Sequence, residues 1–431
     1  MESRTIGGKL ISAQEALARV LNDVHVDTSK IPEWWPSGRT VLLPKTKDLS
    51  DEKNYRPITC LNTSYKILTG MIAKYMREHT IINEIWDEGQ LGAIEGVLGT
   101  VDQLIIDRCI MEEVKQYQRN LAVAFYDYKK AYDKVHHDWM VRVYEWIGIP
   151  RDVIKLITDL MTKWRTRLEI WDGAEKVTSR WIRILCGFLQ GDSYSPVGFC
   201  ITEIPVCVLL QHSRGYRMGE PGNRLVKRTH SLFVDDLKVY QESHETLKVV
   251  NEIIVQASHD TGACYGVSKC AEIIFQNGRM VRGEGLQVLN ERMKTLNPDE
   301  NEVYKFLGIE QADGIRTKNV YDRVKGEVEK RVEMIASTEL NDANMIKAIN
   351  VKVIPVATYA MNICKFTMAE LRTLDQVVKR ELRAKFMLGR QASDERLYSQ
   401  TNIGRKRTEI VEGSVQGDKT ESSGIHGKVE Q

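Results

Sequence analysis

Two adjacent carboxylates lie between two short apolar runs in the stretch "SLFVDDLKVY" at residues 231–240. The flanking runs are typical of strands, and Asp tolerates turn geometry, so Asp235 and Asp236 fit the two-residue turn of a β-hairpin. The same pair can also do chemistry. Two divalent ions can activate an attacking oxygen and stabilise a leaving phosphate, but they require several carboxylates from different strands. A third acidic residue therefore decides between a plain turn and a metal site.

Asp127 is the candidate for the third carboxylate, because it ends the strand-like run "LAVAFY" at residues 121–126. Neighbouring strands lie about 4.8 Å apart, so carboxylates at their ends can meet although they are distant in sequence. Asp127, Asp235 and Asp236 are the predicted metal ligands. Mg²⁺ suits them, since it is a hard ion that binds carboxylates together with substrate phosphates. Asp133 is interpreted as a turn residue before the next helix.

Further candidate binding groups lie in two loops. The stretch "GFLQGDSYSP" at residues 187–196 offers small residues where a backbone can approach a substrate, with Gln190 as a hydrogen-bonding side chain. A strand-to-helix turn is the alternative interpretation of this stretch. Lys45 and Arg56 belong to a proline-containing segment and either are solvated or neutralise a triphosphate.

Composition excludes several classes of protein. The chain has 431 residues, of which 42% are hydrophobic, enough for one large domain or two to three modest ones. The N-terminus lacks the apolar core of a signal peptide, and no apolar stretch is long enough to span a bilayer. Eight cysteines without a CxxC pair indicate neither zinc nor disulfides, and favour a reducing, intracellular compartment. A net charge of +2 does not by itself indicate a nucleic-acid binder.

The predicted elements mix helices and strands, which indicates the α+β class. Apolar residues at helical spacing predict packed helices over residues 61–80 and 101–120. A further helix is predicted from Asp138, as its N-cap, to Gly148.

The chain continues with a predicted hairpin around Asp172 and Gly173 and one long apolar helix after the loop at residues 187–196. The last third is predicted to be helical. "TMAE", starting at Thr367, is a capping box, and one helix carries a stripe formed by Val320, Val324, Val328 and Val332. The polar tail from Ser399 is expected to be disordered.

In this order, the motifs resemble those of the reverse transcriptases of non-LTR retrotransposons, particularly the R2-like lineage. The resemblance covers residues 31–398. "LPK" and "NYRPITCL" resemble the fingers motifs, while "DYKKAYD", "LQGDSYSP" and "FVDD" resemble the first three palm motifs. "GVSKCA" and "YKFLGI" resemble the fourth and fifth, the last being the primer grip. Each motif alone is a weak signal, but the ordered set is specific.

The resemblance implies a role for each matching residue. The catalytic carboxylates would be Asp127, Asp235 and Asp236, which would hold two Mg²⁺ ions that Mn²⁺ can replace. Tyr132 would reject a ribonucleotide by its bulk, and Lys269 would donate a proton to pyrophosphate. The substrate-binding set would be Lys45, Arg56, Tyr132, Gln190, Gly191 and Lys269.

The resemblance also implies a right-hand polymerase fold with fingers, a palm built on an antiparallel sheet, and a helical thumb. The implied limits are 1–120 for the lead-in and fingers, 121–312 for the palm with an inserted part of the fingers, 313–398 for the thumb and 399–431 for the tail. The primer grip, inside the second range, would consist of Phe306, Leu307 and Gly308.

The activity implied by the resemblance is RNA-directed DNA synthesis by two-metal nucleotidyl transfer. Its partners would be an RNA template, a DNA primer or nicked DNA target, and deoxynucleoside triphosphates, with no membrane. An endonuclease would act in trans, and the protein would work inside the cell, in the nucleus or the cytoplasm.

The sequence departs from the family pattern after "EGQLG". Ile94 and Glu95 stand where the family usually has basic residues that contact template, and no endonuclease or zinc motif follows the thumb. The chain is therefore expected to be a truncated copy, and a catalytically weak or inactive remnant that at most binds nucleic acid is the alternative function. An RNA-dependent RNA polymerase is a third interpretation, against which the bulk of Tyr132 argues.

Overall fold

The structure of the chain is a computed structural model that describes residues 4–6, 9–173, 175–220 and 222–384. The chain divides into two compact units. The first consists of Met1–Gln103 and Glu113–Thr295, and the second of Leu104–Glu112 and Leu296–Gln431. Both contain helices and strands, which confirms the predicted α+β class. The tail at residues 399–431 lies outside the described residues.

The central sheet of the first unit is built around strand β5 (Leu121–Tyr126), whose six residues are all buried. A strand covered on both faces has no solvent side, so it reads as a continuous apolar run rather than an alternating one. β5 pairs antiparallel with two neighbours, which in turn pair with the outer strands of the sheet. These strands are β11 (His230–Phe233), β12 (Asp236–Gln241), β13 (Ala271–Gln276), β14 (Arg279–Val281) and β17 (Lys294–Thr295).

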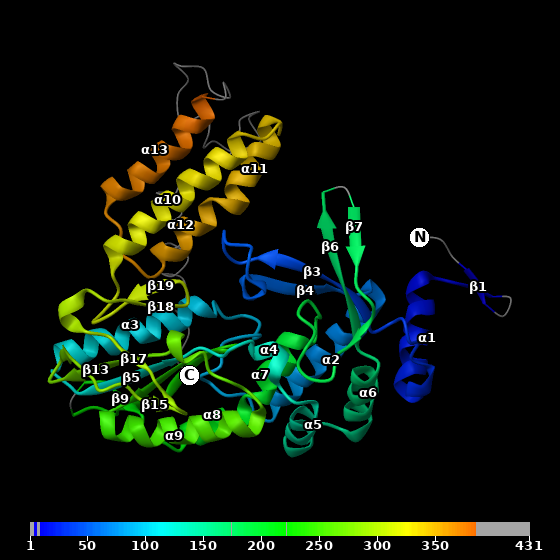
Figure 1. Ribbon diagram of the computed structural model, residues 1–431, viewed down its shortest axis with the longest axis horizontal. Helices are drawn as coiled ribbons and strands as arrows, with labels where there is room; N and C mark the ends of the chain where they lie inside the picture. Colours follow the sequence, from blue (N-terminus) through cyan, green and yellow to red (C-terminus); the bar gives the residue numbers. More distant parts are fainter. Residues whose placement is uncertain (1–3, 7–8, 174, 221, 385–431) are drawn as a thin grey trace, which may run out of the picture. The chain divides into compact units, whose positions relative to one another are not determined.

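Two helices cover one face of this sheet, namely α8 (Ile204–Gln211) and α9 (His244–Thr261) (Figure 1). α9 begins after Ser243, whose hydroxyl accepts a hydrogen bond from the amide of Thr246 and so satisfies a free end of the helix. The apolar faces of both helices bury a common core with the sheet. The core includes Ala122, Ala124, Tyr126, Val206, Leu210, Leu247, Val250 and Ile254.

The predicted long apolar helix after the 187–196 loop was wrong, because the structure has two helices there. α7 (Ser195–Thr202) ends before Glu203, and α8 starts at the next residue. Pro205 explains the break, since its ring clashes with the carbonyl four residues earlier and it has no N–H to donate.

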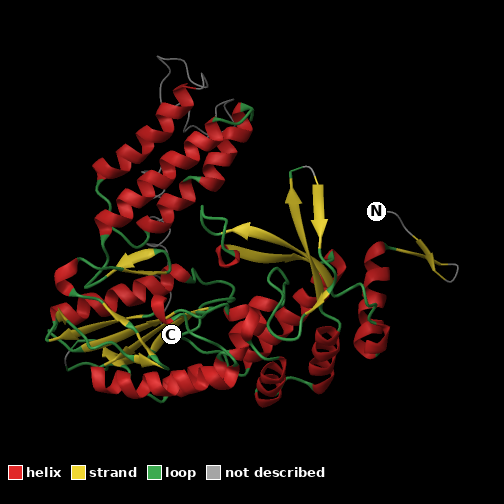
Figure 2. Ribbon diagram, viewed as in Figure 1, coloured by secondary structure: helices red, strands yellow, loops and turns green. Residues whose placement is uncertain are grey.

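A second sheet in the first unit contains the strands on either side of the loop at residues 45–54 (Figure 2). The predicted hairpin around Gly173 is confirmed by the pairing of β6 with β7. β3 pairs with both β4 and β6, so the strands that flank the loop at residues 45–54 belong to the same sheet as the hairpin. The strands are β3 (Ser37–Pro44), β4 (Tyr55–Cys60), β6 (Arg165–Asp172), β7 (Glu175–Thr178) and β8 (Ile182–Arg183).

Several helices of the first unit share one apolar core beside the second sheet. α5 starts at His137, so Asp138 lies in its first turn rather than at the N-cap, and there its charge favours the positive end of the helix dipole. The helices of this core are α1 (Ala13–Val26), α2 (Thr63–Ile82), α4 (Ala131–Lys134), α5 (His137–Trp146), α6 (Arg151–Thr162) and α7. α3 (Thr100–Gln116) is divided between the two units.

Short two-stranded hairpins complete the first unit. They pair β1 (Arg4–Ile6) with β2 (Lys9–Ile11), β9 (Tyr216–Met218) with β10 (Val226–Arg228), and β15 (Gln287–Val288) with β16 (Glu291–Arg292). Among the described residues, no helix combines the length and the apolar character needed to cross a membrane.

The second unit contains a hairpin followed by a group of helices (Figure 1). The valine stripe is confirmed, because all four side chains on α10 are buried. The capping box is confirmed as well, since Thr367 and Glu370 each accept a hydrogen bond from the other's amide at the start of α13. The elements are β18 (Tyr304–Phe306), β19 (Ile309–Gln311), α10 (Thr317–Ala336), α11 (Asp342–Lys352), α12 (Ile354–Met361) and α13 (Met368–Ala384).

The core beside the second sheet contains a polar pair that can be tested. The indole N–H of Trp164 donates to the hydroxyl of Tyr65 at 2.8 Å, and both side chains are buried. Tyr65→Phe should lower the free energy of unfolding by about 1–3 kcal/mol, because it leaves the indole N–H without a partner. Urea unfolding measures this loss. Tyr75→Phe is the matched control on the same helix, where the ring is exposed, and equal stability of the two variants would contradict the prediction.

Candidate active site

The three predicted carboxylates meet at one end of the central sheet. β5 and β12 are antiparallel neighbours, with Tyr126 opposite Leu237. Asp127 therefore leaves β5 at the same edge at which Asp236 begins β12, and Asp235 precedes it in the connecting turn. The pairing of two strands far apart in sequence brings these side chains together, as expected from their positions at strand ends.

The turn itself differs from the prediction by one residue. Phe233 pairs with Asp236, so the two central residues are Val234 and Asp235 rather than the two aspartates. Val234 has φ +59°, and among the described residues of the turn it alone has a positive φ. A positive φ at the first central position is typical of a type II′ turn, which normally takes Gly there. A β-branched residue in this region costs on the order of 1–3 kcal/mol, so the surrounding structure must hold it.

Crowding of the carboxylates changes their acidity. Burial and repulsion from Asp127 raise the pKa of Asp235, against which the positive charges of Arg56 and Lys269 act. Loss of hydration and repulsion from the other two carboxylates raise the pKa of Asp236 to about 6, although its side chain reaches solvent. The ammonium of Lys269 lies 3.4 Å from Oδ2 of Asp127. The site thus has an excess of negative charge that cations stabilise.

A cleft of about 780 Å³ opens beside these carboxylates, a volume suited to a small-molecule substrate. Its lining residues come from several separate segments and include acidic, basic and small side chains. Asp236 and the predicted primer-grip residues are not among its lining residues. The predicted site residues that line it are Lys45, Arg56, Asp127, Tyr132, Gln190, Gly191, Asp235 and Lys269.

Gln190 and Gly191 are held at the wall of the cleft by the second sheet. The carbonyl of Gln190 accepts a hydrogen bond from the amide of Thr59 at 2.6 Å, and its side-chain amide donates to Oδ1 of Asp133 at 3.2 Å. Gly191 has φ +114°, and a Cβ there would lie 2.5 Å from the carbonyl oxygen of Thr59. Only glycine fits this close approach, which is to the backbone of β4; the predicted approach of this loop to a substrate stays a prediction.

Basic residues enter the cleft from separate elements. Arg56 lies on β4, and Lys45 directly follows β3, with its amide bonded to the carbonyl of Asn54 at 2.7 Å. Lys269 ends a short 3-10 helix at Val267–Lys269 and is mostly exposed. Exposed cations around a polar cleft can bind an anionic substrate.

Tyr132 presents its ring to the cleft from α4. The ring stacks on Phe199 with 4.9 Å between centroids and contacts the edge of Phe188 at 6.3 Å. Burial, with a smaller contribution from the charge of Asp235, raises the pKa of Tyr132, so the hydroxyl stays protonated. The stacked ring is fixed in place and can act as a rigid steric element.

Sequence reasoning missed three acidic residues of this region. Asp133 was interpreted as a turn residue, yet it lines the cleft and orients Gln190. Asp192 also lines the cleft, and burial raises its pKa to about 6 although Thr69 donates a hydrogen bond to it at 2.6 Å. Glu203 is buried, its pKa is raised to about 7 by desolvation, and it accepts from the hydroxyl of Tyr128. A glutamate inside an otherwise apolar run was the one available signal.

The predicted primer-grip residues belong to the second unit. Leu307 and Gly308 form the two-residue turn between β18 and β19, both with positive φ, as in a type I′ hairpin. The hydroxyl of Tyr359 donates to the carbonyl of Leu307 at 2.6 Å, and Arg323 donates to that of Gly308 at 2.5 Å. Phe306 is buried. The helices of the unit thus hold the backbone of this turn.

The two departures from the family pattern differ in exposure. Ile94 is partly buried, whereas Glu95 is exposed and forms an ion pair with Arg77 of α2. Glu95 therefore adds no positive charge to this surface and offsets the charge of a neighbouring arginine.

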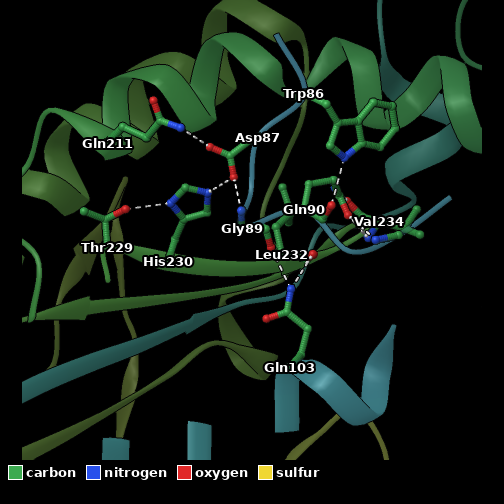
Figure 3. A network of polar contacts seen from close by, with 11 residues as sticks. Trp86, Asp87, Gly89, Gln90, Gln103, Gln211, Thr229, His230, Leu232 and Val234 are labelled. Carbon is green, nitrogen blue, oxygen red and sulfur yellow. Dashed lines mark hydrogen bonds and ion pairs between the residues drawn. The ribbon is translucent and has the colours of Figure 1, made fainter. Parts of the chain in front are cut away.

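Asp87, Cys207 and His230 form a buried group of possible metal ligands. Asp87 already accepts hydrogen bonds from His230 at 2.9 Å, Gly89 at 2.6 Å and Gln211 at 2.5 Å (Figure 3). Burial would raise the pKa of Asp87, but these hydrogen bonds hold it below its usual value. Asp87 and His230 are thus hydrogen-bonded without an ion.

The antiparallel sheet places clustered carboxylates beside a cleft of basic and small residues, which is the arrangement expected of a polymerase palm. The family described as reverse transcriptase (RNA-dependent DNA polymerase) matches residues 43–311. This match extends over more than half of the chain and includes every predicted site residue. The chain belongs to the reverse transcriptase family, and members of this family generally use divalent metal ions.

Relatives with similar sequences include Pol polyproteins of retrotransposable elements. The chain is 22% identical over 394 residues to that of the type-1 element R2 of Nasonia vitripennis, covering 89% of this chain and 35% of the relative. It is 23% identical over 366 residues to the R2 polyprotein of Popillia japonica, covering 84% and 49%. The chain thus spans about a third to a half of the length of these relatives.

Solved structures with some likeness are telomerases. The apo telomerase of Candida tropicalis is 10% identical with a TM-score of 0.46, covering 88% of this chain and 67% of that one. The telomerase of Candida albicans, solved with a fragment of telomeric RNA, is also 10% identical, with a TM-score of 0.43 and coverage of 84% and 65%. With TM-scores below 0.5, these likenesses add nothing to the assignment.

The carboxylates fit divalent ions on chemical grounds. Their oxygens are the hard ligands that such ions prefer. The raised pKa values of Asp235 and Asp236 indicate that burial and neighbouring charge disfavour their ionised forms. Because the pKa of Asp236 lies above its usual 3.8, the fold is destabilised by this charge above about pH 6 and not below about pH 4. A bound divalent ion should remove that penalty.

Adding Mg²⁺ or Mn²⁺ should therefore raise the melting temperature, and more at pH 8 than at pH 5, where protons compete for Asp236. An ion at 100 times its dissociation constant stabilises a protein by about 2.7 kcal/mol. Differential scanning fluorimetry measures the shift. Asp235→Asn should lose most of this shift in melting temperature. Asp138→Asn, at an exposed position of α5, should keep it. Equal shifts in the two variants would show that the ions bind elsewhere.

Proposed function

We propose that the chain is an RNA-directed DNA polymerase that adds deoxynucleotides to the 3′-hydroxyl of a primer. The observation that carries this proposal is the cleft in which Asp127 and Asp235 face Lys45, Arg56 and Lys269. Carboxylates for metal ions beside cations for a polyphosphate are the groups that nucleotidyl transfer needs. Family membership supports the same reaction.

Asp127, Asp235 and Asp236 would hold the metal ions, with Mg²⁺ as the expected ion and Mn²⁺ as its replacement. Bound there, the ions supply positive charge for the attacking and leaving oxygens of an in-line displacement at the α-phosphate. The protein's own groups position the reactants, because phosphoryl transfer depends mainly on alignment and charge stabilisation.

The nucleotide would lie between cations and the Gly191 backbone. Lys45 and Arg56 bind the triphosphate, and Gln190, oriented by Asp133, contacts the nucleotide beside the close approach at Gly191. Lys269 has an exposed ammonium close to Asp127, from which a proton can pass to the departing pyrophosphate. Each of these side chains lines the same cleft.

The domain limits follow from this function. Residues 1–120 would form the lead-in and fingers, 121–312 the palm with part of the fingers and the primer grip, and 313–398 the thumb. The template would be RNA, and the primer would be DNA or a nicked DNA target. Template contacts would go mainly to the backbone, since a polymerase accepts every sequence. The compartment would be the nucleus or the cytoplasm.

A weak or inactive remnant that at most binds nucleic acid is the second candidate. The observation that favours it is Glu95, which pairs with Arg77 where the resemblance calls for added positive charge. Loss of cationic charge weakens binding to a phosphate backbone. All three carboxylates nevertheless stay together at the strand ends, which favours the active enzyme.

Primer extension on an RNA template separates the two candidates. Wild type with Mg²⁺ and deoxynucleotides should extend a DNA primer, and Asp235→Ala should lower the rate by about 100-fold or more, as removal of a group that stabilises the transition state does. Gel analysis of the labelled primer measures both. Asp138→Ala serves as the control for the loss of an exposed carboxylate. Equally little extension by wild type and Asp235→Ala would favour the remnant.

Tyr132 provides a test of sugar selection and of the RNA polymerase interpretation. Tyr132→Ala should raise the ratio of ribonucleotide to deoxynucleotide incorporation by about 10-fold or more, because removing the ring leaves room for a 2′-hydroxyl. Single-nucleotide extension with each substrate measures the ratio. Tyr75→Ala, which removes an exposed ring from α2, should leave it unchanged. A wild type that prefers ribonucleotides would instead support RNA synthesis.

A further inference from the structure

The buried segment before Ile94 and Glu95 runs alongside the turn that carries Asp235. Residue Gln90 forms a parallel bridge with Leu232 of β11. The amide of Leu232 donates to the carbonyl of Gly89 at 2.8 Å, and the amide of Leu91 donates to that of Leu232 at 3.0 Å. The segment "EGQLG" is thus an added edge to the hairpin and not a free loop.

Gln90 bonds to both backbone groups of Val234 (Figure 3). Its Oε1 accepts from the amide of Val234 at 2.9 Å, and its Nε2 donates to the carbonyl of the same residue at 3.1 Å. The amide and the carbonyl of a residue belong to the two peptide planes on either side of its Cα, and the angle between these planes is set by φ and ψ. A side chain that bonds to both planes therefore fixes the strained conformation of Val234. It also orients the peptide that joins Val234 to Asp235.

The side chain of Gln90 is itself rigidly placed. It is 2% exposed, and its backbone carbonyl accepts from the indole N–H of Trp86 at 2.9 Å. Gln103, fully buried on α3, donates to the carbonyls of Gly89 at 2.6 Å and Leu232 at 3.1 Å (Figure 3). These contacts leave Gln90 little freedom, so it can hold its partner in one geometry.

Glycine at position 92 makes this contact sterically feasible. A Cβ on Gly92 would lie 2.6 Å from the amide nitrogen of Val234 and 2.8 Å from Oε1 of Gln90. Its amide donates to the same Oε1 at 2.8 Å. Gly92 does not have a positive φ. The glycine is explained instead by the close packing of its backbone against the backbone of Val234.

We propose that Gln90 is a positioning residue for the reaction under Proposed function, on which this inference rests. By holding both peptide planes of Val234, it keeps the carboxylate of Asp235 in place to bind a divalent ion. Without Gln90, Val234 would relax from its positive φ and the following carboxylate would move. Gln90 does not line the cleft and so acts through the turn rather than on the substrate.

Gln241 is a matched control for the loss of a buried glutamine amide. It lies at the far end of β12, about 20 Å from the turn at 3.3 Å per residue. It is fully buried, donates to the hydroxyl of Ser213 at 2.8 Å and accepts from the amide of Gly215 at 3.1 Å. Gln90→Met and Gln241→Met thus remove similar bonds from the same sheet with little change in volume.

Two measurements on these variants test the proposal. Both variants should lose thermal stability, but Gln90→Met alone should lower kcat about 100-fold, the loss that a misplacement of about 1 Å can cause, with little change in KM for the nucleotide. Titration of the protein with Mn²⁺, followed by electron paramagnetic resonance, should show weaker binding in Gln90→Met and unchanged binding in Gln241→Met. Unchanged Mn²⁺ affinity and kcat in Gln90→Met would overturn the proposal.

A second background tests the role of strain. Glycine adopts a positive φ without cost, so Gln90→Met should reduce kcat and Mn²⁺ affinity less in a Val234→Gly protein than in wild type. Equal losses in both backgrounds would contradict the mechanism. If Gln90→Met does not fold, Gln90→Asn keeps the amide but is too short to bond to both groups, and the same outcomes apply. A wild type that binds Mn²⁺ but extends no primer would refute the proposed function alone, because the Mn²⁺ titration still tests Gln90.

Discussion

Repulsion between carboxylates at one end of the central sheet is the interaction on which the site depends. Asp127 directly follows β5, Asp236 is the first residue of the neighbouring antiparallel strand β12, and Asp235 precedes it. The register of β5 with β12 therefore sets how closely the charges approach. Burial strengthens this repulsion and raises the pKa of Asp235 and Asp236. Cations from other elements partly offset it. A site of this kind favours divalent ions because the folded chain alone does not neutralise it.

A second constraint is the strained backbone that presents Asp235. Val234 has a positive φ that its own side chain disfavours, so the conformation depends on groups outside the hairpin. The buried amide of Gln90 bonds to both of its backbone groups, and Gly92 allows the close approach. The geometry of the charged site therefore depends on these buried residues. The hydrogen bonds that hold Val234 in its strained conformation also fix the position of the Asp235 carboxylate.

Local patterns in the sequence were sufficient for much of the fold. The apolar run of β5, the valine stripe of α10 and the capping box of α13 depend on neighbours one to four residues away, and each was predicted. The central residues of the Asp235 turn were misplaced by one, because they are set by the register of β11 with β12, in which Phe233 lies opposite Asp236. Gln90 and Glu203 escaped attention, since a buried polar residue is recognised only by what it contacts.

The sequence by itself determined the carboxylates, their positions at strand ends and the order of the motifs, because these follow from residue type and short-range periodicity. It also located the glycines and cations of the cleft. Only the tertiary structure decided that Val234 occupies the strained position, that Gln90 supports it and that Asp133 and Asp192 line the cleft. The physical reason is that strand register, burial and hydrogen bonding join residues far apart in the chain. No local pattern encodes which of them will meet.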